Sequence, residues 1–567
     1  MLQIASGRFF NSTELHEHAG NGILYSNFAW VREIETCAGT LVSADAMIGT
    51  TPTSWIVRYI NRMEKLEGPG AIVRVGDAEI VEQFQLLCTL GLRAFFHVER
   101  DVVIHTCRTR PVGRHDRNPP SMFVTRIIQS EVTGTIDDEI RLQKFIDNAL
   151  HLPRVKYTAV LACARAFCDS LVVSSYNIHL AYSMLVYALE SLSQQFHAFD
   201  PAWEHFDENA RQELDTALAD APDAVAKRVK EILTQTQSAK LMARFVAFVI
   251  KHVGESFYLA ESPPTTAGIR ASDLTRALQT AYATRSGFVH RLEPIREQIC
   301  IPELAKGEVL EWDRRPYLTY RGLVRLVQHV LTTFVATGER LETEQYSWRK
   351  KLPGVVTLRV APRYWIWKAD VFSSAASPGV LGGFLSHLNE VKIGDGAITD
   401  MRAVVKKCFE LIPTAKLQEK RAMLLLVLLF NKWVREEDRV SGWEDCVEEH
   451  LSALEDCCIE RLVADLLLGN EWEWSPTQCA ECVEEYLRTR HHKSTLELPW
   501  PQQRGLMLGV YNKMLTAGNK GAAAEWAKRT LLDEAGVPEM QSLIESTAAK
   551  SECFNLATIM WGHLKRS

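Results

Sequence analysis

The sequence predicts a mainly α-helical, multidomain protein that is α+β overall. Strand-like runs are concentrated in the first 135 residues, whereas apolar residues at spacings of three and four dominate from about residue 137. At about 150 residues per domain, a chain of 567 residues is long enough for three or four domains. Its 24% charged and 47% hydrophobic residues are ordinary globular values, which exclude collagen-like, disordered and disulfide-scaffold classes.

Residues 1–135 predict a mixed, β-rich N-terminal domain. The segment from about Ile80 to Leu92 is typical of a helix within it. Three short runs are rich in β-branched or aromatic residues, are bounded by Gly, Asn or Pro, and predict strands: Gly22–Tyr25, Ala71–Val75 and Val102–His105.

Two polar segments of this domain contain residues that could bind a ligand. His16–His18 lies beside Gly20–Gly22, and this composition favours a β-turn over a metal or catalytic site. Cys107–Pro120 contains Pro and Gly and predicts a loop. Its basic side chains could contact RNA phosphates, although a solvated loop is the simpler interpretation; the candidates are Arg108, Arg110, Arg114 and Arg117.

Residues 137–338 predict a helical domain. Asp137–Glu139 opens an amphipathic segment, with acids in the first turn as the helix dipole favours. Helical spacing continues to about residue 255, and Glu261–Gly268 predicts a loop. Helices resume from Ser272 and again over Tyr317–Ala336.

The C-terminal part predicts a connector and a third domain. Residues 339–385 contain a strand-like stretch, Val355–Val360, and a linker-like segment, Ser373–Gly383. Residues 386–567 return to a helical pattern with short connections, which suits an α-helical array or bundle. We find no fixed-period repeat.

The most informative helix is predicted over Ser272–Leu292, where Ser272 or Asp273 can cap it. Its apolar stripe has one gap, and Arg285 fills that gap. An inward-facing guanidinium keeps its charge and therefore needs a carboxylate, a phosphate or water. The alternative is an arginine that extends to the edge of the core.

A second predicted helix, Asn177–Phe196, supplies a partner for this arginine. Glu190 interrupts an otherwise apolar stretch, and it shares a polar lane with Ser183 and Tyr187. A buried carboxylate should be paired, and Arg285 is the partner we expect. A structural ion pair without chemistry is the alternative.

His290 follows Arg285 by five residues, which places it roughly 140° around an ideal helix. The two side chains converge only if the arginine reaches round, or if two copies of the chain form the site together. Ala283, Gly287 and His290 share one lane, and small residues there let another helix approach. We therefore expect a homodimer, with packing inside one subunit as the alternative.

With these residues in place, the region 137–338 resembles the HEPN superfamily of helical ribonucleases and nucleotide-binding modules. Arg285–His290 matches its R-x4–6-H motif, and Tyr187–Leu192 (YALESL) is similar to the ALE-L helix of the Apea-like branch. The helix Arg321–Ala336 fits the same layout. Many members have a polar residue, often Asn, directly after the arginine, and Ser286 stands there here.

The resemblance implies a metal-independent endoribonuclease that acts by attack of the 2′-OH and needs no cofactor. His290 would transfer protons, Arg285 would hold the phosphate, and Glu190 would orient one of them. Ser286 and Tyr187 are supporting residues in this interpretation. The expected products carry 2′,3′-cyclic phosphate and 5′-OH ends.

The resemblance also implies a role as an effector in anti-phage defence or stress response, which a trigger releases from control by the flanking domains. The alternative is a non-catalytic HEPN-like protein that binds nucleotide, dimerises or contacts other proteins. The formal net charge of −6 disfavours a protein that coats nucleic acid but allows a local basic groove.

Other motifs point away from metal, nucleotide-hydrolysing and membrane functions. Cys479 and Cys482 precede His491 and His492, but a capping-box start at Ser475 places both cysteines inside a helix, which disfavours zinc. Trp472 and Trp474 favour core packing over a peptide-binding surface. The sequence contains no Walker A, GxSxG, HExxH or strand-associated GxGxxG motif.

We expect a cytoplasmic protein that does not insert into membranes. The N-terminal MLQIASGRFF lacks the basic segment and long apolar run of a secretory signal. The longest notable apolar stretch, Ala422–Phe430, is far shorter than the roughly 20 residues that span a bilayer. The thirteen cysteines have no framework spacing and are expected to be reduced.

Overall fold

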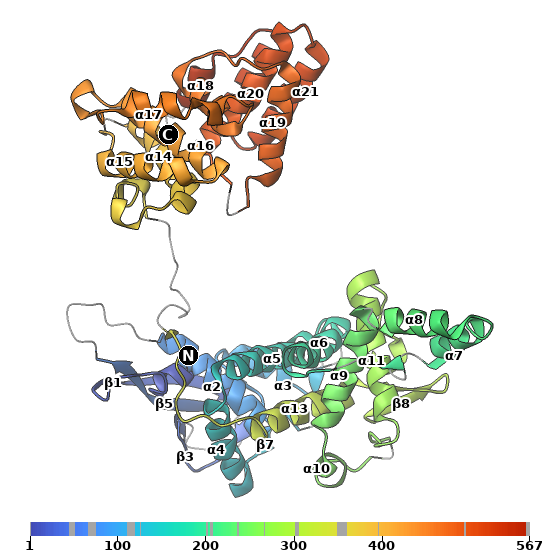
Figure 1. Cartoon of the computed structure of the whole chain (residues 1–567). Helices are drawn as coiled ribbons and strands as arrows, with labels where there is room; N and C mark the ends of the chain where they lie inside the picture. Colours follow the sequence, from blue (N-terminus) through green and yellow to red (C-terminus); the bar gives the residue numbers. More distant parts are fainter. Residues whose placement is uncertain are drawn as a thin grey trace. The chain divides into compact units, whose positions relative to one another are not determined.

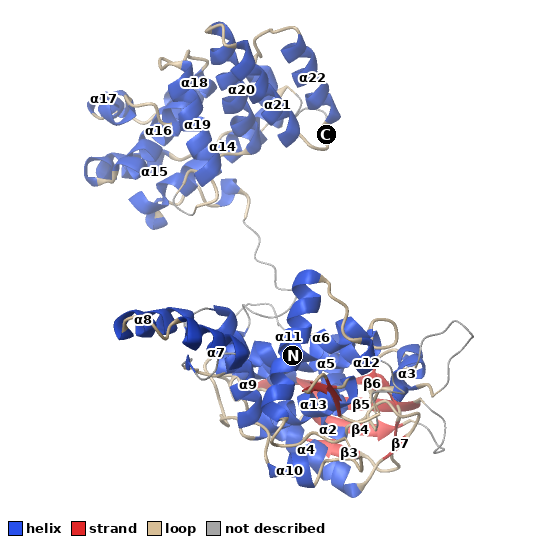
Figure 2. Ribbon diagram, turned by 90° about the vertical axis from the view of Figure 1, so that its right-hand side faces the viewer, coloured by secondary structure: helices blue, strands red, loops and turns tan. Residues whose placement is uncertain are grey.

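The computed structural model divides the chain into two compact units, residues 1–355 and 356–567. It is mainly α-helical, with an antiparallel sheet near the N-terminus (Figures 1 and 2), so the predicted fold class is confirmed. The structure describes residues 2–44, 52–65, 75–109, 119–124, 126–199, 202–203, 208–234, 237–265, 267–300, 306–348, 360–394, 396–492 and 495–562.

The sheet of the first unit is organised around two long strands, β1 (Leu15–Ser26) and β5 (Thr53–Glu64). They pair antiparallel without a break, from Leu15 opposite Glu64 to Ser26 opposite Thr53. The strand order is β3-β4-β5-β1-β6, where the shorter members are β3 (Ile34–Thr36), β4 (Gly39–Ser43) and β6 (Phe96–His97). A separate parallel pair joins β2 (Phe28–Ala29) to β7 (Val132–Thr133).

The turn predicted around Gly20–Gly22 is wrong, because β1 runs straight through it. The glycines are needed there for close packing rather than for a turn. A Cβ at Gly20 would lie 2.4 Å from the Tyr59 ring, and one at Gly22 would lie 2.2 Å from Val81 of α2 (Asp77–Leu92).

The strand predicted over Val102–His105 is also wrong, because this run lies in helix α3 (Arg100–Cys107). Its buried residues are Val103, Thr106 and Cys107, which share one helical face, while Ile104 is exposed. So short an apolar run does not distinguish a helix from a strand by period alone. Residues 71–74 of the predicted strand Ala71–Val75 lie outside the described residues.

The helical part of the first unit surrounds α6 (Ile178–Phe196), which packs on four other helices. Asn177 caps α6 by accepting a hydrogen bond from the Leu180 amide, and Thr135 and Asp138 form a capping box at the acidic start of α4. The long helices are α4 (Ile136–Leu150), α5 (Arg154–Val173), α9 (Gln237–Lys251), α11 (Leu274–Arg291) and α13 (Tyr320–Ala336).

Shorter elements complete this unit. The start of the helix predicted from Tyr317 is corrected, because Arg315–Leu318 forms β9 and pairs with β8 (Val309–Trp312) before α13 begins. The remaining helices are α1 (Leu2–Ala5), α7 (Glu208–Ala217), α8 (Asp223–Thr234), α10 (Glu255–Leu259) and α12 (Glu297–Cys300). Figure 1 shows β1, β3 and β5 near one end of the unit and α7 and α8 near the other.

The predicted N-terminal and central domains do not separate in the structure. One hydrophobic core extends from Leu2 to Trp348, and α2 packs against β1 as well as against α4 and α5. The side chain of Gln328 on α13 donates to the carbonyl of Leu90 on α2, at 3.0 Å. The sheet and the helices share one core because α2 presents apolar side chains to both. The boundary between the units, at residues 355 and 356, lies within the predicted connector.

The second unit is helical throughout its described residues. Its core helix is α16 (Leu417–Trp433), whose apolar run Ala422–Phe430 is almost entirely buried. The other helices are α14 (Ser377–Ile393), α15 (Arg402–Leu411), α17 (Trp443–Glu449), α18 (Ile459–Leu468), α19 (Pro476–Thr489), α20 (Trp500–Thr516), α21 (Lys520–Asp533), α22 (Pro538–Ala549) and α23 (Leu556–Trp561).

The linker predicted over Ser373–Gly383 is wrong, because α14 begins at Ser377. Its glycines serve helix packing: a Cβ at Gly382 would lie 2.5 Å from the Glu497 carbonyl oxygen, and one at Gly383 would lie 2.5 Å from the Trp365 ring. The small residues that make this segment resemble a linker are thus needed for close packing of α14. Residues 355–359 of the strand-like stretch lie outside the described residues.

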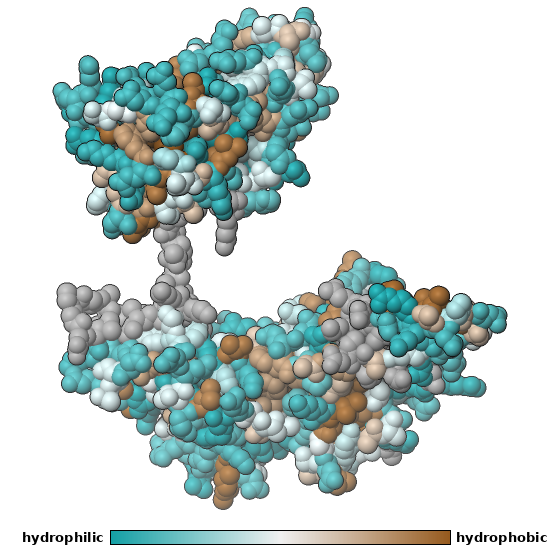
Figure 3. Space-filling model, in the orientation of Figure 1, coloured by the Kyte–Doolittle hydropathy of each residue, from teal (hydrophilic) through white to brown (hydrophobic). Residues whose placement is uncertain are grey.

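The surfaces of both units are mostly hydrophilic in the view of Figure 3, with apolar side chains scattered among polar ones. Within the described part of the chain, no helix combines the length and the apolar character that crossing a bilayer requires. All thirteen cysteines are free thiols.

Candidate functional site

Glu190 of α6 and Arg285 of α11 form an ion pair, as the sequence predicts. Arg285 Nη2 lies 2.8 Å from Glu190 Oε2, and the two side chains are 13% and 6% exposed, respectively. The arginine therefore points into the bundle and does not extend to its edge. Because α6 and α11 pack against each other, two charged residues that each interrupt an apolar face meet.

Tyr282 is the third member of this cluster. Its hydroxyl donates to Glu190 Oε1 at 3.0 Å, and the Arg285 guanidinium lies 6.0 Å from the centroid of its ring. Burial, followed by the negative charge of Glu190, raises the pKa of Tyr282 to about 12. Gln194 adds a second donor to Glu190 Oε1, at 3.3 Å.

Tyr282 and Gln194 were not predicted from the sequence, although a local pattern identifies them. Tyr282 precedes Arg285 by three residues on α11, and Gln194 follows Glu190 by four on α6. Residues at these spacings are neighbours on a helix surface. A search for polar residues one turn from each charged residue would therefore have identified both.

The ion pair leaves polar atoms without hydrogen bonds. Within the described residues, neither Glu190 Oε2 nor Arg285 Nε has a hydrogen-bond partner, although both atoms are buried. The contact at 2.8 Å is therefore a close approach of opposite charges rather than an aligned hydrogen bond. A ligand oxygen that accepts a hydrogen bond from the buried Arg285 Nε would make binding more favourable.

His290 does not join the cluster within one chain. It is exposed in the last turn of α11, and no hydrogen bond or ion pair between it and any described residue is found. Ser286 is half-buried, and Tyr187 is 56% exposed on α6. The structure therefore brings Glu190 and Arg285 together and leaves His290 and Tyr187 on the surface.

The small-residue lane on α11 is partly covered by the chain itself. A Cβ at Gly287 would lie 2.8 Å from Glu293 Oε2, and Glu293 forms a two-point ion pair with Arg291. Asp273 occupies the N-cap position of α11 without a side-chain capping hydrogen bond. Ala283 and His290 are the exposed members of the lane.

The basic segment near α3 is described only at its first arginine. Arg108 is half-buried, and its Nη1 lies 3.1 Å from His105 Nδ1. The other candidates for RNA contact, Arg110, Arg114 and Arg117, lie outside the described residues.

The cysteine pair considered for zinc lies within α19, as the predicted capping box of Ser475 and Gln478 requires. Cys479 is buried, and burial raises the pKa of its thiol to about 12. Among the described residues, no group of three or more His, Cys, Asp or Glu is arranged to hold a metal ion.

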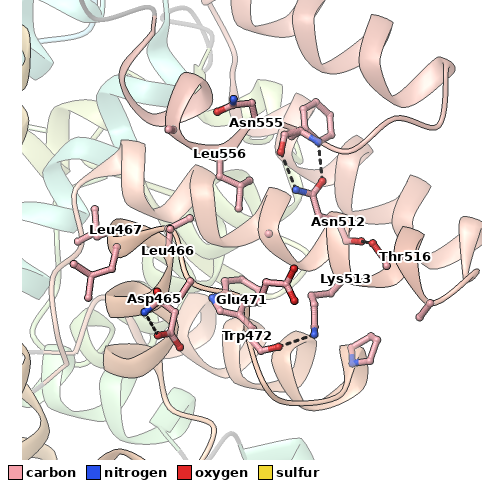
Figure 4. Close-up of a pocket in the computed structure, with 18 of the residues that line it drawn as sticks. Asp465, Leu466, Leu467, Glu471, Trp472, Asn512, Lys513, Thr516, Asn555 and Leu556 are labelled. Atoms are coloured by element: carbon pink, nitrogen blue, oxygen red, sulfur yellow. Dashed lines mark hydrogen bonds between the residues drawn. The ribbon is translucent and has the colours of Figure 1, made fainter.

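The second unit contains a cavity of about 760 Å³ between α18, α20 and α23 (Figure 4). Trp472 forms part of its wall but is 6% exposed and donates to the Leu462 carbonyl at 3.1 Å, so it packs in the core as predicted. Lys513 donates to the Trp472 carbonyl at 2.7 Å, and Asn512 exchanges two hydrogen bonds with the backbone of Phe554. These polar groups of the wall are therefore bonded within the chain.

No protein-family model, curated protein or solved structure matches this chain. The resemblance to the HEPN superfamily therefore rests on the residues quoted above, and the activity that it implies stays a prediction.

Proposed function

We propose that this chain is a metal-independent endoribonuclease of HEPN type. The observation that carries the proposal is the buried Glu190–Arg285 pair between α6 and α11, with His290 exposed five residues further along α11. An arginine held by a carboxylate and a histidine open to solvent are the two chemical groups that RNA cleavage by 2′-OH attack needs.

Arg285 would bind the scissile phosphate and stabilise the charge that develops on it. A guanidinium presents five N–H donors, and the closest approach of Glu190 is to one of its nitrogens, Nη2. Charge-assisted hydrogen bonds from the remaining donors to phosphate oxygens are strong and directional. Glu190 and Tyr282 then act as positioning residues, because they hold the guanidinium in one orientation.

His290 would move the protons. An imidazole can accept the 2′-OH proton or donate a proton to the 5′-oxygen leaving group at neutral pH. Because His290 and Arg285 occupy different faces of α11, we place the complete site between two copies of the chain, with RNA as substrate. A homodimer is therefore part of the proposal.

We assign the nuclease a regulated effector role in anti-phage defence or stress response in the cytoplasm. A trigger would release it from inhibition. This assignment predicts that the purified full-length protein is weakly active until the trigger is present.

The main alternative is a non-catalytic HEPN-like protein that binds nucleotide or dimerises. The observation that favours it is the burial of the ion pair: with 6% and 13% of their side chains exposed, Glu190 and Arg285 are also well placed to stabilise the helix packing alone. In this case His290 is an ordinary surface residue.

The deciding experiment is an RNA cleavage assay in EDTA with total RNA and tRNA. It compares the wild type, His290→Ala and the control His491→Ala, which removes an exposed histidine from the other unit. Without the trigger we expect weak cleavage that leaves 2′,3′-cyclic phosphate ends, lost in His290→Ala and retained in the control. Substitutions at exposed positions change the free energy of unfolding by about 0.5 kcal/mol or less. All three proteins should therefore unfold at nearly the same temperature. Equal cleavage by His290→Ala would contradict the proposed role of this residue.

A further inference from the structure

A second cavity, of about 480 Å³, lies at the sheet of the first unit. Its wall consists of Ala19–Asn21 of β1, Thr36–Thr40 at the β3–β4 turn, and Arg58–Ile60 with Arg62 of β5. This volume is within the range of small-molecule sites, which is about 300–1,000 Å³. The site that contains Glu190 and Arg285 shares none of these residues.

The cavity arises from the strand register. Thr40 pairs with Arg58, and the β4–β5 ladder ends there, so the following residues of β5 pair with β1 only. Gly39, at φ 152°, brings the chain so close that a Cβ would lie 2.4 Å from the Arg58 carbonyl oxygen. Absence of a side chain at this position therefore lets the β3–β4 turn lie directly against β5.

Three hydrogen-bonding side chains that line this cavity form a row across the sheet, and Glu35 of β3, the cross-strand partner of Thr40, continues the row outside the lining. Asn21 of β1 and Thr40 of β4 are the direct cross-strand partners of Arg58, one on each side of it. Directly opposed residues in antiparallel strands project from the same face, with Cβ atoms about 5 Å apart. An amide, a guanidinium and a hydroxyl therefore stand side by side on one face.

The charge of the wall is positive. Arg58 and Arg62 are its charged side chains, and no carboxylate is among the lining residues. Arg62 is paired with Glu17 outside the cavity, at 3.0 Å. Arg58 is exposed, and the described residues offer it no ion pair or side-chain hydrogen bond. A guanidinium flanked by two further donors and lacking a carboxylate is suited to a phosphate group.

We propose that this cavity binds the phosphate group of a phosphorylated small molecule of nucleotide size. Arg58 binds two phosphate oxygens, and Asn21 and Thr40 donate the flanking hydrogen bonds. Ile60 and Ala38 provide an apolar surface for the remainder of the ligand. A volume of about 480 Å³ favours a small ligand over an RNA strand. This assignment is independent of the proposed nuclease activity.

The test is isothermal titration of the full-length protein with AMP, and with adenosine as the probe that lacks phosphate. We expect AMP to bind and adenosine not to bind. Arg58→Gln should weaken AMP binding about tenfold or more, because it removes a charge-assisted pair of hydrogen bonds. Arg100→Gln, which removes an exposed arginine at the start of α3, should bind AMP like the wild type.

A second variant, Thr40→Val, keeps the β-branched shape and removes only the hydroxyl. Weaker AMP binding by this variant therefore also supports the proposed contact between Thr40 and the phosphate. Absence of AMP binding at millimolar concentration would overturn the proposal. So would equal binding by Arg58→Gln, equal binding of adenosine, or binding of an RNA oligomer without binding of AMP. None of these readouts depends on RNA cleavage, so failure of this site and failure of the nuclease proposal are separable.

Discussion

Replacing Arg285 by Met should destabilise the first unit, because it leaves the Glu190 carboxylate buried without its cation. Breaking a buried ion pair from one side costs about 3–5 kcal/mol. The side chain of Arg285 is 13% exposed, and Tyr282 and Gln194 still donate to Glu190 Oε1 in the variant. We therefore expect a loss near the lower end, about 3 kcal/mol.

The expected shift in melting temperature follows from the size of the unit. At about 2.1 cal/mol/K per residue, the 355 residues of this unit have an unfolding entropy of about 0.75 kcal/mol/K. A loss of about 3 kcal/mol then lowers the Tm of this unit by about 4 °C. Differential scanning calorimetry of the full chain measures this shift, and the transition of the second unit is the internal reference.

The double variant Glu190→Leu/Arg285→Met tests the physical reason. It removes both charges, so no buried charge is left unpaired, and it should regain at least half of the lost stability. A Tm change below about 1 °C for Arg285→Met would refute the reasoning. A double variant less stable than either single variant would also refute it, because the loss would then come from packing rather than from the unpaired carboxylate.

Two further predictions concern α14 and the tyrosine of the ion-pair cluster. Gly383→Ala should destabilise the second unit by about 1–3 kcal/mol, because the added Cβ overpacks the contact with Trp365. Gly379→Ala in the same helix places its Cβ in open space and should stabilise the unit by about 0.4–1 kcal/mol. Thermal unfolding of the two variants measures both changes. Because the pKa of Tyr282 is raised to about 12 from 10.0, the stabilisation that comes from its neutral phenol is present below pH 10 and is lost as pH rises towards 12. Tyr282→Phe should therefore lose less stability than the wild type between pH 10 and 12 in urea titrations, and an equal loss would contradict the shift.

The pairing of Glu190 with Arg285 could be predicted because it depends on two local features of the sequence. Helical period places each residue on an inward face, and a buried charge requires a partner of opposite sign. The catalytic geometry could not be predicted in the same way. His290 lies on another face of α11, and whether a second chain completes the site depends on surfaces that periodicity does not describe.

Three of the wrong predictions have one cause, which is that small residues and short apolar runs have several structural uses. Gly20 and Gly22 are typical of a turn, yet the structure uses them where side chains of a neighbouring strand and helix approach β1. Gly382 and Gly383 are typical of a linker, yet they lie within a packed helix. In both cases the decisive contact is with another element of the fold, which helical or strand periodicity does not describe.

By itself, the sequence determined the mainly helical class, the start of several helices at their capping residues, and the need of Arg285 for an anion. These features depend on interactions within a few turns of one helix. Only the tertiary structure decided that the sheet and the helical bundle share one core, and that Asn21, Arg58 and Thr40 stand in one row. The physical reason is that strand register and burial are set by contacts between distant segments, and a one-residue shift of register would move Arg58 to the opposite face.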